Sequence, residues 1–356
     1  MGYDVIVVGG GIGGLTVAAL LSARGMNTCV LERQSQVGGC IARVEFSGYD
    51  FEPGMGLYIS FGPGGVYEKL FAALPVEPPE VSFTTPRVIR LPDGTDVASV
   101  KEQLYSIRGG PATLAERLAE SIKRSGGSVR LNSPVLRLAF DKSGAAVGVD
   151  LLSGEQVFAR TIVSNLTIWD TYGKLVGVNR TPPEIKKRLN TLQGRGAYLV
   201  YASMEASAVA RLPSERMLVK DNAGEFTVAI ASSQAAPERK RAVTFHTETD
   251  VESWFTYQSS EEDYEEWDQT ALETFWTRLH AALPELGSDI EVIETANPRT
   301  YYDLTRRKLG MVLGTGEQSL GSATFLPNLL MVGDTVSSHA QVNSVIESAL
   351  GLADHI

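Results

Sequence analysis

Cysteine and histidine are scarce in this chain, which has 356 residues but only 2 cysteines and 4 histidines. Two cysteines cannot build the disulfide framework of a secreted domain, so we expect a reducing compartment and predict a cytoplasmic location. The histidines are scattered and lack the spacing of metal ligands, so no metal site is predicted.

Long apolar runs are also missing. No stretch approaches the roughly 18 apolar residues of a membrane-spanning helix, and Asp4 and the following glycines interrupt the N-terminal apolar run, so neither a transmembrane segment nor a signal peptide is predicted. The net charge of −10 repels nucleic acid, which we therefore exclude as a partner. Peripheral contact with a membrane and the oligomeric state stay open.

The usual catalytic sets are absent from the sequence. There is no Ser-His-Asp order, no pair of carboxylates at catalytic spacing, no CxxxxC redox disulfide and no second GxGxxG motif. Any chemistry would therefore depend on a bound cofactor, with the protein supplying its position and its electrostatic surroundings.

The N-terminal segment has the pattern of a strand, a glycine-rich turn, a helix and a second strand. Tyr3–Val8 is a short β-branched run typical of a buried parallel strand. Residues 15–24 are rich in Ala and Leu and predict a helix, which Gly25 can end in a left-handed cap. Residues 26–31 predict the second strand, which closes with Glu32. This order predicts a dinucleotide-binding βαβ unit.

Gly9, Gly11 and Gly14 have the spacing GxGxxG at the turn. The first permits a tight turn, the second lets a pyrophosphate approach the backbone, and the third lets helix and strand pack closely. Glu32, about 20 residues further on, can accept hydrogen bonds from the ribose hydroxyls of an adenosine. An acid there disfavours NADP, while FAD and NAD both remain open.

The following segment resembles the flavoprotein superfamily of phytoene desaturases, carotenoid isomerases and amine oxidases. The matching residues are Gly38 and Gly39, close after the ribose acid, and then the aromatic-acid-x-Gly stretch Phe51-Glu52-Pro53-Gly54. The resemblance implies FAD as the cofactor, with the glycine pair against its diphosphate and the later stretch near the flavin.

Further matches occur in order along nearly the whole chain. They are Gly109-Gly110 before a helix at 114–124, the strand at Val135, Ile162-Val163-Ser164-Asn165, the spacing P-x-T-x4-T-x-R-x2-G from Pro298 to Gly310, and the closing strand Leu329–Asp334. The spacing from Pro298 is more typical of the desaturase and isomerase branch than of amine oxidases. In this family the C-terminal strand joins the sheet of the N-terminal unit.

The resemblance implies an α/β fold with a Rossmann-type, glutathione-reductase-like FAD-binding domain and a discontinuous α+β substrate domain built on a sheet. The expected FAD-binding domain comprises residues 1–57, 106–168 and 290–356, and the substrate domain comprises 58–105 and 169–289. Strands are expected at 197–204, 226–231 and 242–247, a hairpin at 86–95 and a helix within 259–283, with helices on one side of the sheet.

The resemblance also implies a set of residues that bind the cofactor. They are Gly9, Gly11, Ile12, Gly13, Gly14, Glu32, Arg33, Gly38, Gly39, Cys40, Gly54, Met55, Gly56, Val135, Asn165, Gly333, Asp334, Gln341, Val342 and Asn343. The helix after Asp334 should point its N-terminus at the flavin pyrimidine, where its dipole stabilises the negative charge of the reduced ring. Asn343 or Ser344 is the expected N-cap of this helix.

Two positions differ from the family pattern. Cys40 stands where the family usually has Arg after the glycine pair, and Arg43 is a candidate to replace that contact. Cys40 is either a small buried filler or a redox or covalent-flavin residue. His339 lies in a polar loop where the branch has a Gly/Pro-rich turn, and it is either the catalytic acid/base or an exposed loop histidine.

The implied function is that of an FAD-dependent, desaturase-like oxidoreductase that removes hydride from a lipophilic, isoprenoid or polyene-like substrate through flavin N5. The long helical insertion of the carotenoid enzymes is largely missing, because Gly109 follows closely on the turn at Asp93-Gly94. A smaller or protein-delivered lipophilic substrate is therefore an alternative to a long polyene. An amine-oxidase-like enzyme, a flavin-dependent isomerase and an FAD-binding protein without turnover also remain open.

Overall fold

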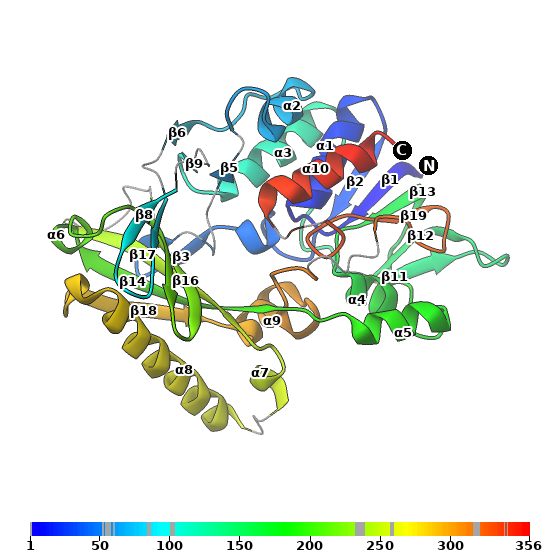
Figure 1. Ribbon diagram of the computed structural model, residues 1–356. Helices are drawn as coiled ribbons and strands as arrows, with labels where there is room; N and C mark the ends of the chain where they lie inside the picture. The colour runs from blue at the N-terminus through cyan, green and yellow to red at the C-terminus, as the bar shows by residue number, and fades with distance from the viewer. Residues whose placement is uncertain are drawn as a thin grey trace.

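The computed structural model describes residues 2–51, 53, 58–59, 61–83, 87–99, 104–231, 239–256, 260–315, 321–337, 339 and 341–356. Within these residues the chain forms two seven-stranded sheets and two smaller ones. Figure 1 shows the first large sheet at the upper right, beside α1, α3 and α10, and the second at the lower left, above α8.

The first sheet has the strand order β10-β2-β1-β13-β12-β11, and β19 also pairs with β13. These strands are β10 (Ser128–Arg130), β2 (Thr28–Leu31), β1 (Tyr3–Val8), β13 (Gln156–Ser164), β12 (Ala146–Leu151), β11 (Val135–Phe140) and β19 (Leu329–Met331). The central strand β1 is parallel to both β2 and β13, and Val5, Ile6 and Val7 are fully buried. A strand covered on both faces needs apolar residues at successive positions, which explains the N-terminal apolar run.

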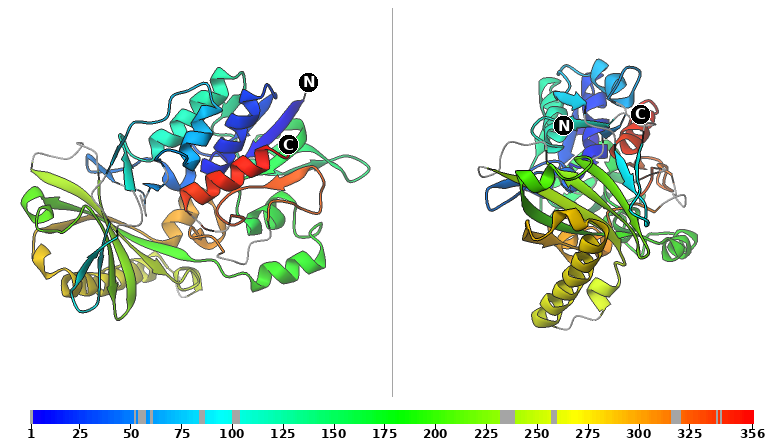
Figure 2. Two further views of the ribbon diagram at one scale, coloured as in Figure 1. Left: turned by 45° about the horizontal axis from the view of Figure 1, so that its top comes forward. Right: turned by 60° about the vertical axis from the view of Figure 1, so that its left-hand side comes forward.

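Helices cover both faces of this sheet. One core contains residues of α1 (Ile12–Ala23), α2 (Val66–Ala72), α3 (Ala112–Arg124) and α10 (Val342–Ala353). The core on the other face contains residues of α4 (Ile168–Asp170) and the π-helical turn η2 (Thr171–Leu175), and partly buried residues of α5 (Pro183–Thr191) pack against it. Figure 2 shows α10, in red, lying along α1, in blue, although the two helices come from opposite ends of the chain. The predicted Rossmann-type α/β fold is confirmed.

The second sheet has the strand order β18-β14-β17-β16-β15-β7-β8. These strands are β18 (Ile290–Ala296), β14 (Gly196–Glu205), β17 (Lys240–Thr249), β16 (Gly224–Ile230), β15 (Arg216–Asp221), β7 (Val88–Arg90) and β8 (Asp96–Ala98). The long helix α8 (Glu261–Ala282) covers one face, where Phe275 packs against Phe226 and Phe245. The predicted sheet with a helix on one side is therefore present.

A short hairpin of β3 (Val44–Phe46) and β4 (Tyr49–Phe51) covers part of the opposite face. The rings of Phe46 and Phe51 lie 5.6 and 5.1 Å from that of Tyr201 on β14. The other small sheet joins β5 (Tyr58–Ile59), β9 (Leu104–Ile107) and β6 (Val81–Phe83). The remaining helical segments are η1 (Gly39–Ile41), α6 (Ala206–Val209), α7 (Ser253–Thr256), η3 (Pro284–Leu286), α9 (Pro298–Thr305) and η4 (Lys308–Gly310).

The packing bears on the predicted domain boundaries. β7, from the segment 58–105, pairs in parallel with β15, from the segment 169–289, so the two insertions share one sheet. However, α2 packs into the core of the first sheet, and β18, which begins at Ile290, belongs to the second. The exact boundaries stay a prediction. None of the helices in the described part of the chain has both the length and the apolar character needed to cross a bilayer.

Candidate cofactor-binding site

The turn between β1 and α1 is built from glycine for steric reasons. A Cβ on Gly14 would lie 2.4 Å from the carbonyl oxygen of Gly9, and Gly9 itself has a φ of +100°. α1 begins at Ile12 after its N-cap Gly11, with no side-chain hydrogen bond capping it. The amides of this first turn and the helix dipole suit a phosphate group. The loop therefore has the shape and the donors that a diphosphate requires.

The second glycine pair lies against this loop. The Gly38 amide donates a 2.8 Å hydrogen bond to the Gly10 carbonyl, and Gly38 forms a parallel bridge with Gly11. A Cβ on Gly39 would lie 3.4 Å from the Cα of Gly11. Both glycines of the pair have positive φ values, +114° and +58°. The two glycine segments thus form a cradle lined by backbone, which fits the expected contact with the diphosphate.

Glu32, at the end of β2, is buried beside the same loop. Its Oε2 accepts a 2.6 Å hydrogen bond from the Gly10 amide, and its Oε1 accepts one of 2.8 Å from the Gln34 amide. A carboxylate has about four acceptor positions. Two remain after these bonds, so Glu32 can bind a ribose hydroxyl while it fixes the turn. Its predicted contact with adenosine remains a prediction.

Asn165, directly after β13, contacts the glycine loop through its side chain. Its amide Nδ2 donates a 3.3 Å hydrogen bond to the carbonyl of Gly9, and its backbone amide donates to Val8. A Cβ on Gly11 would lie 2.7 Å from Nδ2, and one on Gly13 would lie 2.9 Å from Oδ1. Asn165 therefore fills the space that the missing glycine side chains leave. Glu32 and Asn165 together support the glycine loop through hydrogen bonds to Gly10 and Gly9.

The C-terminal strand brings Gly333 and Asp334 to this place. β19 runs parallel to β13, and a Cβ on Gly13 would lie 3.3 Å from the Gly333 amide nitrogen. α10 then begins at Val342 with Gln341 as its N-cap and no side-chain cap. The expected N-cap, Asn343 or Ser344, is therefore wrong: the helix starts earlier. Two helices without side-chain caps, α1 and α10, begin near the glycine loop.

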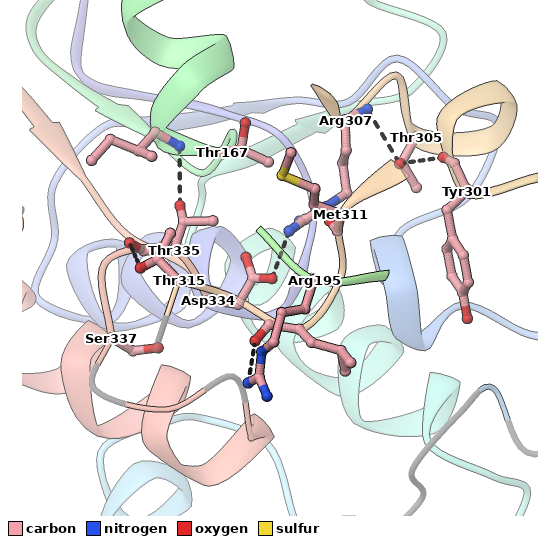
Figure 3. Close-up of polar contacts among 12 residues, drawn as sticks. Thr167, Arg195, Tyr301, Thr305, Arg307, Met311, Thr315, Asp334, Thr335 and Ser337 are labelled. Atoms are coloured by element: carbon pink, nitrogen blue, oxygen red, sulfur yellow. Dashed lines mark hydrogen bonds and ion pairs between the residues drawn. The ribbon is translucent and has the colours of Figure 1, made fainter. Parts of the chain in front are cut away.

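Arg307 forms an ion pair with Asp334 beside the cradle, as Figure 3 shows. Its Nη2 lies 2.5 Å from Asp334 Oδ2, and its Nε donates to the carbonyl of Met311 at 2.5 Å. The two side chains are only 14% and 17% exposed. The sequence indicated Arg307 as part of a family spacing and not as a member of the site. The spacing P-x-T-x4-T-x-R-x2-G was the signal that could have identified it.

The turn that carries Arg307 accounts for most residues of that spacing. Asn297 and Thr300 form a capping box at the start of α9, and Thr305 Oγ1 donates a 2.6 Å hydrogen bond to the Tyr301 carbonyl. Gly310 has a φ of +62°, and a Cβ there would lie 1.7 Å from the carbonyl oxygen of Pro298. Only glycine fits at this position. The motif therefore builds the turn that places Arg307.

Cys40 lies next to this ion pair. Burial raises the pKa of its thiol, while the positive charge of Arg307 acts in the opposite direction and Asp334 raises it further. Arg43 instead forms a 3.1 Å ion pair with Asp50 in the β3–β4 hairpin. The arginine whose charge acts on the Cys40 position is therefore Arg307. Both cysteines are free thiols.

The other predicted residues differ in how exposed they are. Arg33 is exposed, and Val135, Val342 and Asn343 are half-buried. His339 is exposed, and its carbonyl accepts a 2.6 Å hydrogen bond from Ser337 Oγ. Gly54, Met55 and Gly56 lie outside the described residues. The catalytic role of His339 stays a prediction.

Comparisons with known proteins agree with this geometry. Residues 86–356 match the family model for flavin-containing amine oxidoreductases, and residues 7–74 match that for an NAD(P)-binding Rossmann-like domain. Over 247 residues the chain is 28% identical to prolycopene isomerase of Arabidopsis thaliana, a match that covers 64% of this chain and 41% of that protein. It is 26% identical to the neurosporene-forming phytoene desaturase of Cereibacter sphaeroides over 69% of this chain and 52% of that protein.

A solved structure shares the whole fold. An oxidoreductase from Methanosarcina mazei superimposes with a TM-score of 0.75 at 15% identity, over 98% of this chain and 99% of that one. In contrast, the matches to prolycopene isomerases cover only 36% to 41% of the length of those proteins.

Proposed function

Because this chain belongs to the family of flavin-containing amine oxidoreductases, we propose that it removes hydride from a lipophilic, isoprenoid or polyene-like substrate. Its cofactor is FAD. The observation that carries the proposal is the convergence of Gly333 and Asp334 on the loop at Gly9–Gly14, because it joins both ends of the chain in one cradle.

Different residues of the cradle would bind different parts of FAD. The start of α1 and the pair Gly38-Gly39 would hold the diphosphate with backbone amides, and Glu32 would bind the adenosine ribose. Bound FAD supplies a hydride acceptor at its N5 atom. The start of α10 would stabilise negative charge on the flavin pyrimidine through its dipole. Asp334, fixed by Arg307, would bind the ribityl or diphosphate part.

The apolar wall beyond the cradle supports a lipophilic substrate. Phe46 and Phe51 pack against Tyr201, and Leu199 and Ala197 lie in the same buried cluster. Because these side chains are apolar and aromatic, a ligand that contacts this face of the sheet would carry little charge. Some relatives are named as prolycopene isomerases and as a phytoene desaturase. These names support the proposal that the substrate of this chain is a polyene.

Anaerobic titration of the FAD-loaded protein tests the proposal. Phytoene in detergent micelles should bleach the visible flavin absorbance, and chromatography should show a product with one more double bond. Putrescine at the same concentration is the matched amine probe and should leave the absorbance unchanged.

The other outcomes identify the alternatives. Bleaching by putrescine alone would support an amine-oxidase-like enzyme. Conversion of prolycopene to another isomer by the prereduced protein, without net change in flavin absorbance, would support an isomerase. Stable FAD binding with no reaction in any of these assays would support a protein without turnover and would overturn the proposal.

A further inference from the structure

The face of the second sheet opposite α8 carries two buried polar side chains in adjacent strands. His246 on β17 and Thr227 on β16 are direct cross-strand partners. They are 5% and 8% exposed, respectively. Side chains of directly opposed residues have Cβ atoms about 5 Å apart, so these two can bind one group together.

Both side chains lack the hydrogen bonds that buried polar groups normally have. Thr227 Oγ1 has no partner, and no hydrogen bond joins the His246 ring to any other residue in the part of the chain that the structure describes. Most buried polar atoms in folded proteins are hydrogen-bonded, and each exception calls for an explanation such as a ligand or an ordered water. Burial also lowers the pKa of His246 to about 4, so the ring is neutral at neutral pH and can both donate and accept.

The surroundings of the pair are apolar. In the row across the sheet, Leu199 lies beside His246, and Leu218 lies beside Thr227. Both leucines are buried. A mostly apolar surface with a few convergent polar groups is the usual form of a ligand site. The row therefore suits an apolar molecule that carries one neutral oxygen function.

This row is continuous with the candidate cofactor site. Tyr201 follows Leu199 on the same face of β14, and its ring contacts Phe51 of the hairpin behind the glycine pair. Tyr301 is on α9, which contacts both β14 of the sheet and the segment η1 that carries Cys40. Thr227 is two strands away from Leu199, about 10 Å. A molecule that reaches from the cradle to the pair must be elongated.

We propose that His246 and Thr227 bind a hydroxyl or carbonyl oxygen at one end of an elongated lipophilic substrate, and so select oxygenated over purely hydrocarbon polyenes. The inference rests on the proposed function, because it assumes that the substrate lies between this sheet face and the flavin. A neutral histidine and a hydroxyl together can donate to and accept from one oxygen, whereas they offer no negative charge to an ammonium group.

Equilibrium binding to the FAD-loaded protein tests this inference without turnover. The probes are all-trans-retinol and the hydrocarbon in which hydrogen replaces its hydroxyl, each titrated by quenching of protein fluorescence. The wild-type protein should bind the alcohol about threefold to tenfold more tightly, the difference that one or two hydrogen bonds produce. Thr227→Val and His246→Leu should each reduce this preference, with little change in the affinity for the hydrocarbon.

Thr247→Val is the matched control. Thr247 follows His246 on β17 but faces α8, and its hydroxyl donates a 3.1 Å hydrogen bond to the Glu225 carbonyl. This variant should keep the preference of the wild-type protein. A merely structural role predicts loss of stability in Thr227→Val, whereas a hydroxyl without a partner can be replaced by a methyl group at little cost.

Equal affinity of the wild-type protein for the two probes would overturn the inference, and so would a preference that survives both substitutions. Equal affinity is also the result expected if only ordered water occupies the pair. Failure of the proposed function is separate, because it would appear as absence of flavin bleaching by both phytoene and all-trans-retinol, whatever the binding preference.

Discussion

Arg307 and Asp334 form a buried ion pair that joins the turn after α9 to the turn after β19, with Nη2 and Oδ2 2.5 Å apart. The guanidinium also donates to the Met311 carbonyl through Nε, so two bonds fix its orientation. A buried pair contributes little net stability compared with apolar residues, but loss of one partner leaves an isolated charge in an apolar setting. The pair therefore ties the predicted flavin-binding acid to a single position.

Arg307→Met should lower the free energy of unfolding by about 3 kcal/mol, because it leaves the Asp334 carboxylate buried and unpaired. Urea denaturation measures this loss. The control is Arg306→Met, since the neighbouring Arg306 forms an exposed 3.0 Å pair with Asp303 and its loss should cost less than about 1 kcal/mol. Similar losses in the two variants would contradict the structural role of the buried pair.

Glu32→Gln should weaken FAD binding by about tenfold or more, since one of the two carboxylate acceptors becomes a donor facing a backbone amide. The bonds at stake are those from Gly10 and Gln34. Titration of the apoprotein with FAD, followed by flavin fluorescence, gives the dissociation constant. Glu155→Gln, at an exposed acid paired with Arg130, should leave it unchanged. An unaltered constant in Glu32→Gln would remove Glu32 from the site.

Gly14→Ala should prevent normal packing of α1 on β1, because the added Cβ would lie 2.4 Å from the Gly9 carbonyl oxygen. We expect a large loss of thermal stability together with loss of FAD binding. Gly351→Ala is the control, since nothing lies within 4 Å of a Cβ there and the position is inside α10. That change should raise stability by about 0.5–1 kcal/mol. A Gly14→Ala protein with normal stability would refute the steric argument.

Stability should fall as the pH is lowered from about 6.5 towards 4, partly through His246. Burial lowers its pKa to about 4 in the folded state, so the unfolded chain binds an extra proton in this range. Protonation of the unfolded state then favours unfolding, by up to about 3 kcal/mol for this residue. His246→Gln should flatten the dependence of the unfolding free energy on pH. An identical pH profile in the variant would show that His246 does not contribute.

His339→Ala should leave FAD affinity and the rate of flavin reduction nearly unchanged, because the side chain is exposed. The measurement is stopped-flow reduction of the FAD-loaded variant by phytoene. A fall in the rate of about a hundredfold, with intact FAD binding, would instead identify His339 as the acid/base.

Local patterns accounted for the N-terminal unit. The apolar run of β1, the glycine spacing and the helix that follows depend on neighbours in sequence, and the structure contains them with small differences at the ends. The N-cap of α10 was mispredicted because Asn and Ser favour caps by local propensity. The actual start at Val342 accompanies burial of Val345, Ile346 and Ala349 in the core shared with α1.

Contacts between residues far apart in the sequence were harder to predict from local patterns. Asn165 supports Gly9 from 156 residues away, and the charge of Arg307 acts on Cys40 although the two residues are far apart in the sequence. The spacing around Thr305 indicated a family branch, but its physical purpose, a turn that directs Arg307 to Asp334, appears only when the chain is folded.

The amino-acid sequence by itself determined the phosphate loop and the acid at Glu32, because turn chemistry and strand and helix periodicity act over a few residues. FAD as the cofactor was implied by the resemblance to a flavoprotein family. The tertiary structure decided which arginine pairs with Asp334 and which polar side chains lie together on the face of the second sheet opposite α8. Those choices depend on strand register and on the packing of sheets against each other, and His246 and Thr227 become partners only through the pairing of β16 with β17.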